Sequence, residues 1–158
     1  FQSGGEMISE VTFDKTTYND LPYKYEAGTP NIAGAIGLKA AIDFVNHIGK
    51  HISREREDTL LKYATSCLEL IPGLSVVGKA RNKISLISFV IKGFHPQDIG
   101  VLLDQQGIAL RTGHHCTQPL MKRFGIPGTV RASFAVYNTE DEIDRLIAGI
   151  WKALKMLS

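Results

Sequence analysis

The spacing of apolar residues changes along this chain, and each change marks the edge of an expected element. Some segments carry apolar residues three and four positions apart, the period of an amphipathic helix, and others carry short alternating or uniformly apolar runs, as strands do. The pattern predicts helices at residues 32–48, 53–70, 95–106, 117–124 and 139–157. It predicts strands or extended segments at residues 9–18, 74–77, 84–91, 108–111 and 130–136.

Residues that begin or end helices support these boundaries. Gly49 is expected to end the first helix, and Pro72 followed by Gly73 to stop the second. Thr139 and Glu142 have the spacing of a capping box at the start of the last helix. The second helix has an inner stripe that we expect to face the core: Leu60, Leu61, Ala64, Cys67 and Leu68.

The order of these elements predicts an α+β fold. An extended arm and two helices come first, followed by the order β-β-α-β-α-β-α, so we expect one small sheet covered by helices. Residues 84–91 are almost uniformly apolar, which favours a strand buried on both faces. The first ~45 residues are less self-sufficient than the rest, because their arm and loop lack a partner sheet.

Composition narrows the class of protein. A chain of 158 residues with 44% hydrophobic and 22% charged residues is long enough for one domain with a core. A net charge of +2 gives no reason to expect nucleic acid or an anionic membrane as a partner. No apolar run approaches the ~20 residues that span a bilayer, and FQSGGEMISE has no features of a signal peptide. Two cysteines make no disulfide framework, so we expect a reduced, cytoplasmic protein.

The segment RTGHHCTQPL, residues 111–120, holds the more informative cysteine. Cys116 is either a small buried core residue whose neighbouring histidines cap a turn, or a thiolate that reacts. Its polar neighbours, between a predicted strand and a helix start, favour an exposed loop and a reactive thiol. A nearby arginine or protonated histidine would favour the thiolate. His114, His115 and Cys116 are adjacent and cannot easily share one ion, so we expect no metal site.

Two arginines and one loop have two interpretations each. Arg131 lies within an apolar strand, where it either faces solvent beside a carboxylate or binds a substrate carboxylate through two parallel hydrogen bonds. Arg111 admits the same two interpretations. The loop EAGTPN, residues 26–31, is either a turn with an N-cap or a phosphate-binding cradle ahead of a helix.

Four motifs, SGGEMI, EAGTPN, RTGHHC and VRASFAVYNT, together resemble the carboxy-terminal part of group II (SufS-like) cysteine desulfurases. These enzymes use pyridoxal 5'-phosphate, are similar to class V aminotransferases and include selenocysteine lyases. RTGHHC with the downstream arginine motif is highly specific, whereas EAGTPN is shared more widely. The resemblance covers essentially the whole chain and implies the small domain of a fold type I enzyme. Residues 1–46 would be the tail of the cofactor-binding large domain, and residues 47–158 the small domain with the catalytic cysteine.

The resemblance implies roles for individual residues. Cys116 matches the cysteine that takes sulfur from L-cysteine as a persulfide, leaving L-alanine, for iron–sulfur cluster assembly. Arg131 matches the arginine that holds the substrate α-carboxylate, and Arg111 is a second arginine of that region. Thr29 matches a residue that reaches the cofactor phosphate of the partner subunit in a homodimer, and Gly4 lies in a loop that approaches the same phosphate. A sulfur-acceptor protein of the SufE or SufU kind is also implied.

One feature of that family is missing from this sequence. The family's cofactor-binding lysine belongs to a Ser/Gly-His-Lys segment upstream of the glycine loop, and no such segment is present. Pyridoxal chemistry needs that lysine, so we expect the isolated chain to be inactive. The chain opens at Phe1 rather than Met, and we expect it to be one portion of a larger enzyme. Two alternatives stay open: a selenocysteine lyase, and a cofactor-free sulfur-carrier or interaction module.

Overall fold

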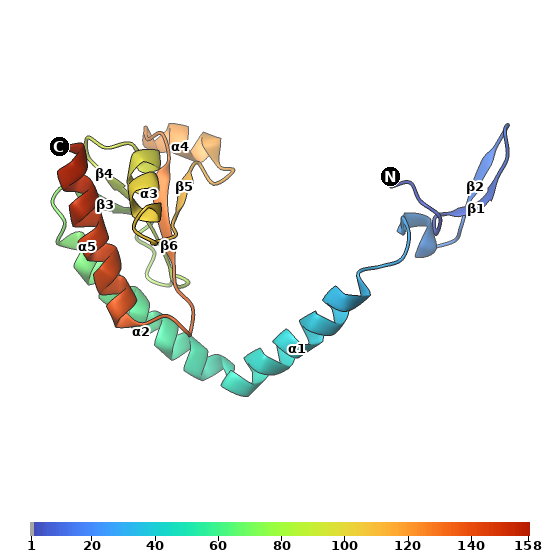
Figure 1. Cartoon of the computed structure of the whole chain (residues 1–158), viewed down its shortest axis with the longest axis horizontal. Coiled ribbons are helices and arrows are strands. Elements are labelled where there is room, and N and C mark those ends of the chain that lie inside the picture. The colour runs from blue at the N-terminus through green and yellow to red at the C-terminus, as the bar shows by residue number, and fades with distance from the viewer. Residues whose placement is uncertain (1) are drawn as a thin grey trace. The chain divides into compact units, whose positions relative to one another are not determined.

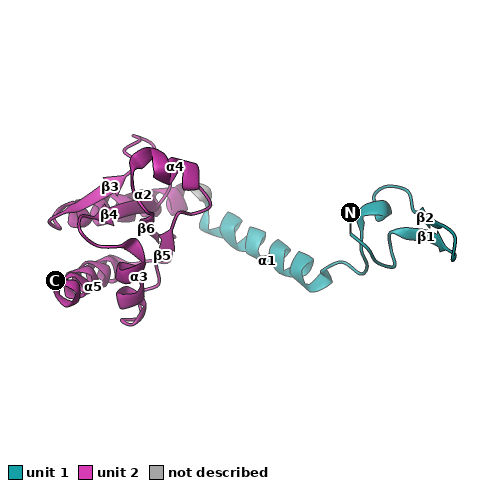
Figure 2. Cartoon of the chain, turned by 90° about the horizontal axis from the view of Figure 1, so that it is seen from above, with its two compact units in different colours: residues 1–49 teal, residues 50–158 magenta. Residues whose placement is uncertain are grey.

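The computed structural model describes residues 2–158, except for the side chain of Lys50. The chain divides into two compact units, Phe1–Gly49 and Lys50–Ser158 (Figure 2). This division lies close to the boundary expected from sequence, between residues 46 and 47. Helices and short antiparallel strands occur in both units, so the predicted α+β class is confirmed.

The first unit begins with a β-hairpin. β1 (Ile8–Val11) pairs antiparallel with β2 (Thr16–Tyr18), and the Thr12 amide donates to the Lys15 carbonyl at 2.8 Å across the turn. The single extended segment predicted over residues 9–18 is therefore wrong. The chain reverses there without a glycine because the Thr12 hydroxyl accepts a hydrogen bond from the Lys15 amide at 3.0 Å, which satisfies the turn's backbone.

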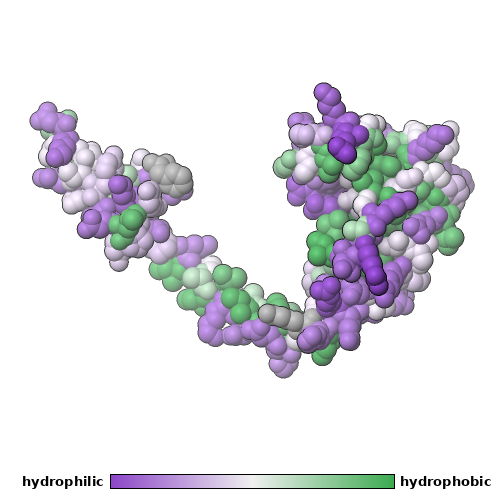
Figure 3. Space-filling view, turned by 180° about the vertical axis from the view of Figure 1, so that it is seen from behind, coloured by the Kyte–Doolittle hydropathy of each residue, from purple (hydrophilic) through white to green (hydrophobic). Residues whose placement is uncertain are grey.

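A short 3-10 turn, η1 (Tyr23–Tyr25), leads to α1 (Ile32–Ile48), which matches the predicted helix. Asn31 caps its start by accepting a hydrogen bond from the Gly34 amide at 2.8 Å, and Gly49 ends it with φ of 83°, as predicted. No residue of α1 is buried, and Figure 3 shows hydrophobic atoms gathered along this helix. Its exposed large apolar residues are Ile32, Ile36, Leu38, Ile42, Phe44 and Val45.

The second unit is one antiparallel sheet with helices packed against one face, as the element order predicted (Figure 1). Its strands lie in the order β3-β4-β6-β5. Their bounds are β3 (Leu74–Val77), β4 (Leu86–Ile91), β5 (Arg111–Gly113) and β6 (Thr129–Ser133). The helices are α2 (Lys50–Glu69), α3 (Pro96–Asp104), α4 (Gln118–Phe124) and α5 (Glu140–Leu157).

The core lies between the sheet and the helices α2, α3 and α5. Alternate residues of β4 are buried in it, namely Ile87, Phe89 and Ile91, and so are Val130 and Ala132 of β6. The intervening residues of β4 are only half-buried, so the prediction of a strand buried on both faces is wrong. Apolar residues on both faces of the strand conceal this alternation in the sequence.

The inner stripe predicted for α2 is buried at Leu60, Leu61, Ala64 and Leu68. Cys67 is only half-buried, which corrects the expectation that it faces the core. It sits beside the stripe rather than within it, because a helix buries a limited arc of its surface.

The predicted capping box at the start of α5 is confirmed. The Thr139 hydroxyl accepts from the Glu142 amide at 3.3 Å, while the Glu142 carboxylate accepts from the Thr139 amide at 3.0 Å. These reciprocal bonds satisfy two donors that a helix start otherwise leaves open. The pKa of Glu142 is lowered, chiefly by a hydrogen bond from the Asn138 side chain and then by the bond from the Thr139 amide.

The strands β5 and β6 differ from their predicted bounds. β5 begins at Arg111 and β6 ends at Ser133, whereas the sequence predicted strands over 108–111 and 130–136. The chain leaves the sheet after Ser133 and turns, with the Asn138 side chain accepting a backbone amide hydrogen bond at 2.8 Å. The paired part of β5 is short and ends where the candidate site begins.

Candidate active site

Cys116 lies in the loop between β5 and α4, and its side chain is exposed. The buried core cysteine that the sequence left open is thereby excluded. The loop is a tight turn in which the His114 carbonyl accepts from the Thr117 amide at 2.8 Å and from the Thr117 hydroxyl at 2.7 Å. The Cys116 amide donates to Nδ1 of His114 at 3.2 Å. His114 therefore caps the turn while the cysteine stays accessible.

The backbone of this turn is unusual. His115 and Cys116 have φ angles of 52° and 60°, and Gly113 just before them has φ of 114°. Side chains other than glycine rarely occupy this left-handed region, because the Cβ atom crowds the backbone. Two such residues in succession redirect the chain from the end of β5 into α4. Backbone strain of this kind is concentrated at functional sites.

Arg111 and Arg131 lie directly opposite each other in the pairing of β5 with β6, and Arg131 lies opposite Ser88 of β4. Opposed residues share a face of the sheet, so these three side chains lie on the face that points away from Val130 and Ala132 of the core. The structure therefore brings together the two arginines that sequence spacing could not place.

The two arginines differ in burial. Arg111 is exposed, whereas Arg131 is half-buried and its Nε atom is buried without a hydrogen-bond partner. Within residues 2–158, no carboxylate forms an ion pair with either arginine. The interpretation of Arg131 as a strand residue beside a carboxylate neighbour therefore does not hold, and an incoming anion would supply the missing partner.

His115 connects the cysteine loop to β6, the strand that carries Arg131. Its Nε2 atom lies 3.0 Å from the hydroxyl and 3.3 Å from the carbonyl oxygen of Thr129, at the start of β6. Burial of the ring lowers the pKa of His115; the hydrogen bond to Thr129 opposes this, and the charges of Arg131 and Arg111 lower the pKa further. Both guanidinium groups thus act on the residue next to Cys116. Thr129 carried no signal in the sequence, because its contact depends on the register of β5 and β6.

Gly4 and Thr29 both belong to the first unit, in two loops that touch. A Cβ atom at Gly4 would overlap the backbone carbonyl of Ala27, so only glycine allows this approach. Thr29 is exposed, and within the described chain its hydroxyl has no hydrogen-bond partner. A cavity of about 380 Å³ lies beside it, with Glu6 and Glu26 in its lining. An unpartnered hydroxyl and a closely approaching backbone are groups of the kind that hold a phosphate oxygen, and two carboxylates line the same cavity.

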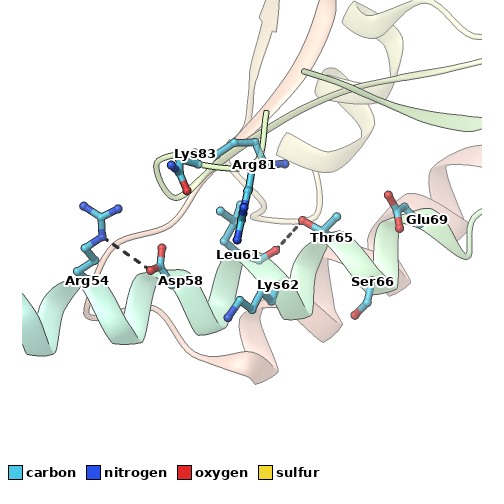
Figure 4. Close-up of a pocket in the computed structure, with 10 residues that line it drawn as sticks. Arg54, Asp58, Leu61, Lys62, Thr65, Ser66, Glu69, Arg81 and Lys83 are labelled. Atoms are coloured by element: carbon cyan, nitrogen blue, oxygen red, sulfur yellow. Dashed lines mark hydrogen bonds and ion pairs between the residues drawn. The ribbon is translucent and has the colours of Figure 1, made fainter. Parts of the chain in front are cut away.

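The second unit also has a groove of about 540 Å³ (Figure 4), which is separate from the Cys116 loop of the same unit. Part of the lining of the groove comes from the loop before β4. The first residue of β4, Leu86, is paired with Ser133 at the end of β6. The Cys116 loop instead follows Gly113, which lies opposite Thr129 at the start of β6. The groove is therefore at the other end of the sheet. Its charged lining comes from α2 and from the loop between β3 and β4: Arg54, Asp58, Lys62, Glu69, Arg81 and Lys83.

Among the described residues, no group of three or more His, Cys, Asp or Glu side chains could hold a metal ion. The adjacent polar residues of the cysteine loop have separate partners, since His115 bonds to Thr129 and His114 to the Cys116 amide. Within residues 2–158, no helix combines the length and the apolar character that crossing a bilayer requires.

Residues 1–146 match the family described as aminotransferase class-V. The chain belongs to this family. A probable cysteine desulfurase from Xylella fastidiosa is 50% identical over 157 residues, which are 99% of this chain and 38% of that protein. The resemblance to cysteine desulfurases drawn from the four motifs is therefore confirmed, and the chain spans less than two-fifths of this relative's length.

Solved structures show the same likeness in three dimensions. The S-sulfonic acid form of the cysteine desulfurase CsdA from Escherichia coli is 39% identical with a TM-score of 0.82, over 99% of this chain and 39% of that one. The apo cysteine desulfurase from Thermococcus onnurineus NA1 is 38% identical with a TM-score of 0.81, over 98% of this chain and 39% of that one. The class V fold predicted for the chain is thereby confirmed.

Proposed function

We propose that this chain is the carboxy-terminal part of a SufS-like cysteine desulfurase in which Cys116 takes sulfur from L-cysteine. The observation that carries the proposal is the exposed Cys116 on a strained turn that follows β5, the strand whose Arg111 lies opposite Arg131. Among the described residues, neither arginine has a carboxylate partner. The chain is 50% identical to a probable cysteine desulfurase, and in such an enzyme the cysteine can accept sulfur while the arginines bind the substrate carboxylate. Residues 1–46 belong to the large domain in this proposal, and residues 47–158 form the small domain.

The proposed reaction uses the Cys116 thiolate as a nucleophile. The thiolate attacks the sulfur of the substrate cysteine, so that a sulfur–sulfur bond forms and the bond between that sulfur and the substrate Cβ breaks. The electron pair of the broken bond remains with the substrate, which takes up a proton and leaves as L-alanine. Cys116 is left as a persulfide. An exposed position allows the thiol to accept sulfur and then present it to a second protein.

Arg131 and Arg111 bind the substrate α-carboxylate in this proposal. A guanidinium group suits a carboxylate because it offers two parallel N–H donors. Arg131 is the stronger candidate, since its half-buried side chain retains an unpartnered Nε atom. Arg111 on the neighbouring strand adds positive charge to the same face of the sheet.

Pyridoxal 5'-phosphate is the cofactor of the proposed enzyme and supplies the electron sink for the reaction. In this chain, the Gly4 loop and the Thr29 hydroxyl would contact its phosphate, and we assign this contact to the cofactor of the partner subunit in a homodimer. Because this sequence lacks the lysine segment, the isolated chain would not turn over L-cysteine. The persulfide would pass in the cytoplasm to an acceptor of the SufE or SufU kind for iron–sulfur cluster assembly.

L-alanine formation by the longer protein that contains this chain tests the proposal. Cys116→Ala should abolish release of L-alanine from L-cysteine, whereas Cys67→Ala, which changes the half-buried cysteine of α2, should leave most of it. Equal loss in both variants, or full activity in Cys116→Ala, would refute the assignment. Turnover of selenocysteine by the same proteins separates a desulfurase from a selenocysteine lyase.

A further inference from the structure

The left-handed backbone conformation at His115 and Cys116 is unfavourable, so contacts with the surrounding structure must stabilise it. Inside the turn, Thr117 bonds to the His114 carbonyl, and the Cys116 amide bonds to the His114 ring at 3.2 Å. These contacts close the turn upon itself but do not attach it to the sheet. Strained conformations persist only where the surrounding structure over-determines them.

Among the described residues, one side chain of the turn has hydrogen-bond contacts with the sheet. This side chain is His115, whose Nε2 atom lies 3.0 Å from the hydroxyl and 3.3 Å from the carbonyl oxygen of Thr129. Thr129 is only 2% exposed and is paired with Gly113, so it belongs to the rigid part of the fold. The other ring nitrogen, Nδ1 of His115, is buried without a partner. Within the described chain, Thr129 is therefore the polar anchor of this ring.

We propose that Thr129 is a positioning residue for Cys116, acting through His115. Its hydroxyl fixes the imidazole, the imidazole fixes the left-handed backbone at His115, and this backbone sets the direction of the Cys116 thiol. The role in sulfur transfer rests on the proposed function, whereas the anchoring of the loop does not depend on it.

Two variants separate this anchoring from simple packing. Thr129→Val keeps the branched shape of a buried strand residue but removes the hydroxyl, and leaves His115 only the longer contact to the carbonyl. Thr129→Ser keeps the hydroxyl and removes a methyl group. If Thr129 only fills space, the serine variant is the more harmful. If Thr129 anchors His115, the valine variant is the more harmful to the loop.

Hydrogen exchange of this chain, followed by mass spectrometry, tests the anchor without substrate or cofactor. In Thr129→Val, the amides of residues 114–117 should exchange about two- to tenfold faster, the effect expected for one lost hydrogen bond, while β4 exchanges as before. Thr129→Ser should resemble the parent chain. His115→Ala should accelerate the same amides, and adding Thr129→Val to it should have no further effect.

Three results would overturn the proposal: no acceleration in Thr129→Val, acceleration that is equal in β4 and the loop, or additive effects in the double variant. If Thr129→Val does not fold, His115→Ala carries the test, because it leaves β6 intact. In the longer enzyme, Thr129→Val should lower kcat for L-cysteine with little change in KM, since the carboxylate-binding arginines are untouched. If the parent enzyme has no turnover of L-cysteine, the proposed function is refuted, but the hydrogen-exchange test of the anchor remains valid.

Discussion

Arg111 and Arg131 face each other across β5 and β6, and among the described residues no carboxylate forms an ion pair with either. Like charges directly opposed in a sheet destabilise it. A chain that keeps such a pair gives up some stability at this position, which is the expected behaviour of a site that binds an anion.

Arg111→Gln should stabilise the chain by about 0.2–1 kcal/mol, because it removes the repulsion while keeping a polar, exposed side chain. Urea unfolding measures the change. Arg81→Gln is the control, since Arg81 is exposed in the loop before β4 and should change stability by no more than about 0.5 kcal/mol. Destabilisation by Arg111→Gln would contradict the repulsion between the two arginines. In the longer enzyme, the same variant should weaken binding of L-cysteine.

Gly128→Ala should destabilise the second unit by about 1–3 kcal/mol, the usual effect of overpacking. A Cβ atom at Gly128 would lie 2.8 Å from the backbone of Gly113, which leads into the cysteine loop. Thermal unfolding of the chain measures the effect. Gly37→Ala is the control, because a Cβ atom there meets no neighbour within 4 Å and should favour α1. Equal stability of Gly128→Ala and the parent would show that β5 and β6 tolerate separation at this point.

Stability should fall as the pH is lowered from about 7 to 5, in part through His115. Burial of its ring holds its pKa below the value of about 6.5 that it has in the unfolded chain. Between these two values the unfolded state binds more protons, so the free energy of unfolding rises with pH. Urea midpoints at several pH values measure this slope. His115→Gln should reduce this slope, and an unchanged slope in that variant would contradict the assignment.

Thr139→Ala should cost about 0.5–2 kcal/mol of stability, because it removes the hydroxyl that caps α5. Chemical unfolding measures this cost. Thr59→Ala is a matched control in α2, where the Thr59 hydroxyl donates a hydrogen bond to the Glu55 carbonyl of the same helix at 2.8 Å. That substitution should be neutral or stabilising, since alanine is the better helix former. Equal effects at both positions would mean that the capping box contributes nothing.

The features that could be predicted from sequence are those set by neighbouring residues. The capping box of Thr139 and Glu142, the end of α1 at Gly49 and the exposure of Cys116 among polar neighbours are of this kind. The hairpin of the first unit was missed because its turn at Thr12 contains no glycine or asparagine.

The rest depends on contacts between residues distant in sequence. The register of β5 with β6 places Arg111 opposite Arg131, and only this register shows that the two arginines form one site. The register of β5 with β6 also brings Thr129 to His115, a contact that no local sequence pattern predicts. The alternation in β4 was hidden because Leu86 and Val90 place apolar residues on the uncovered face as well, and the helices decide which face is covered.

The mass of the Cys116 peptide, from the longer enzyme treated with L-cysteine and then trapped by alkylation, is the most direct test of sulfur transfer. We predict that this peptide gains one sulfur atom, that the Cys67 peptide does not, and that Arg131→Gln reduces the gain at limiting L-cysteine. An unmodified Cys116 in an enzyme that still releases L-alanine would contradict the account.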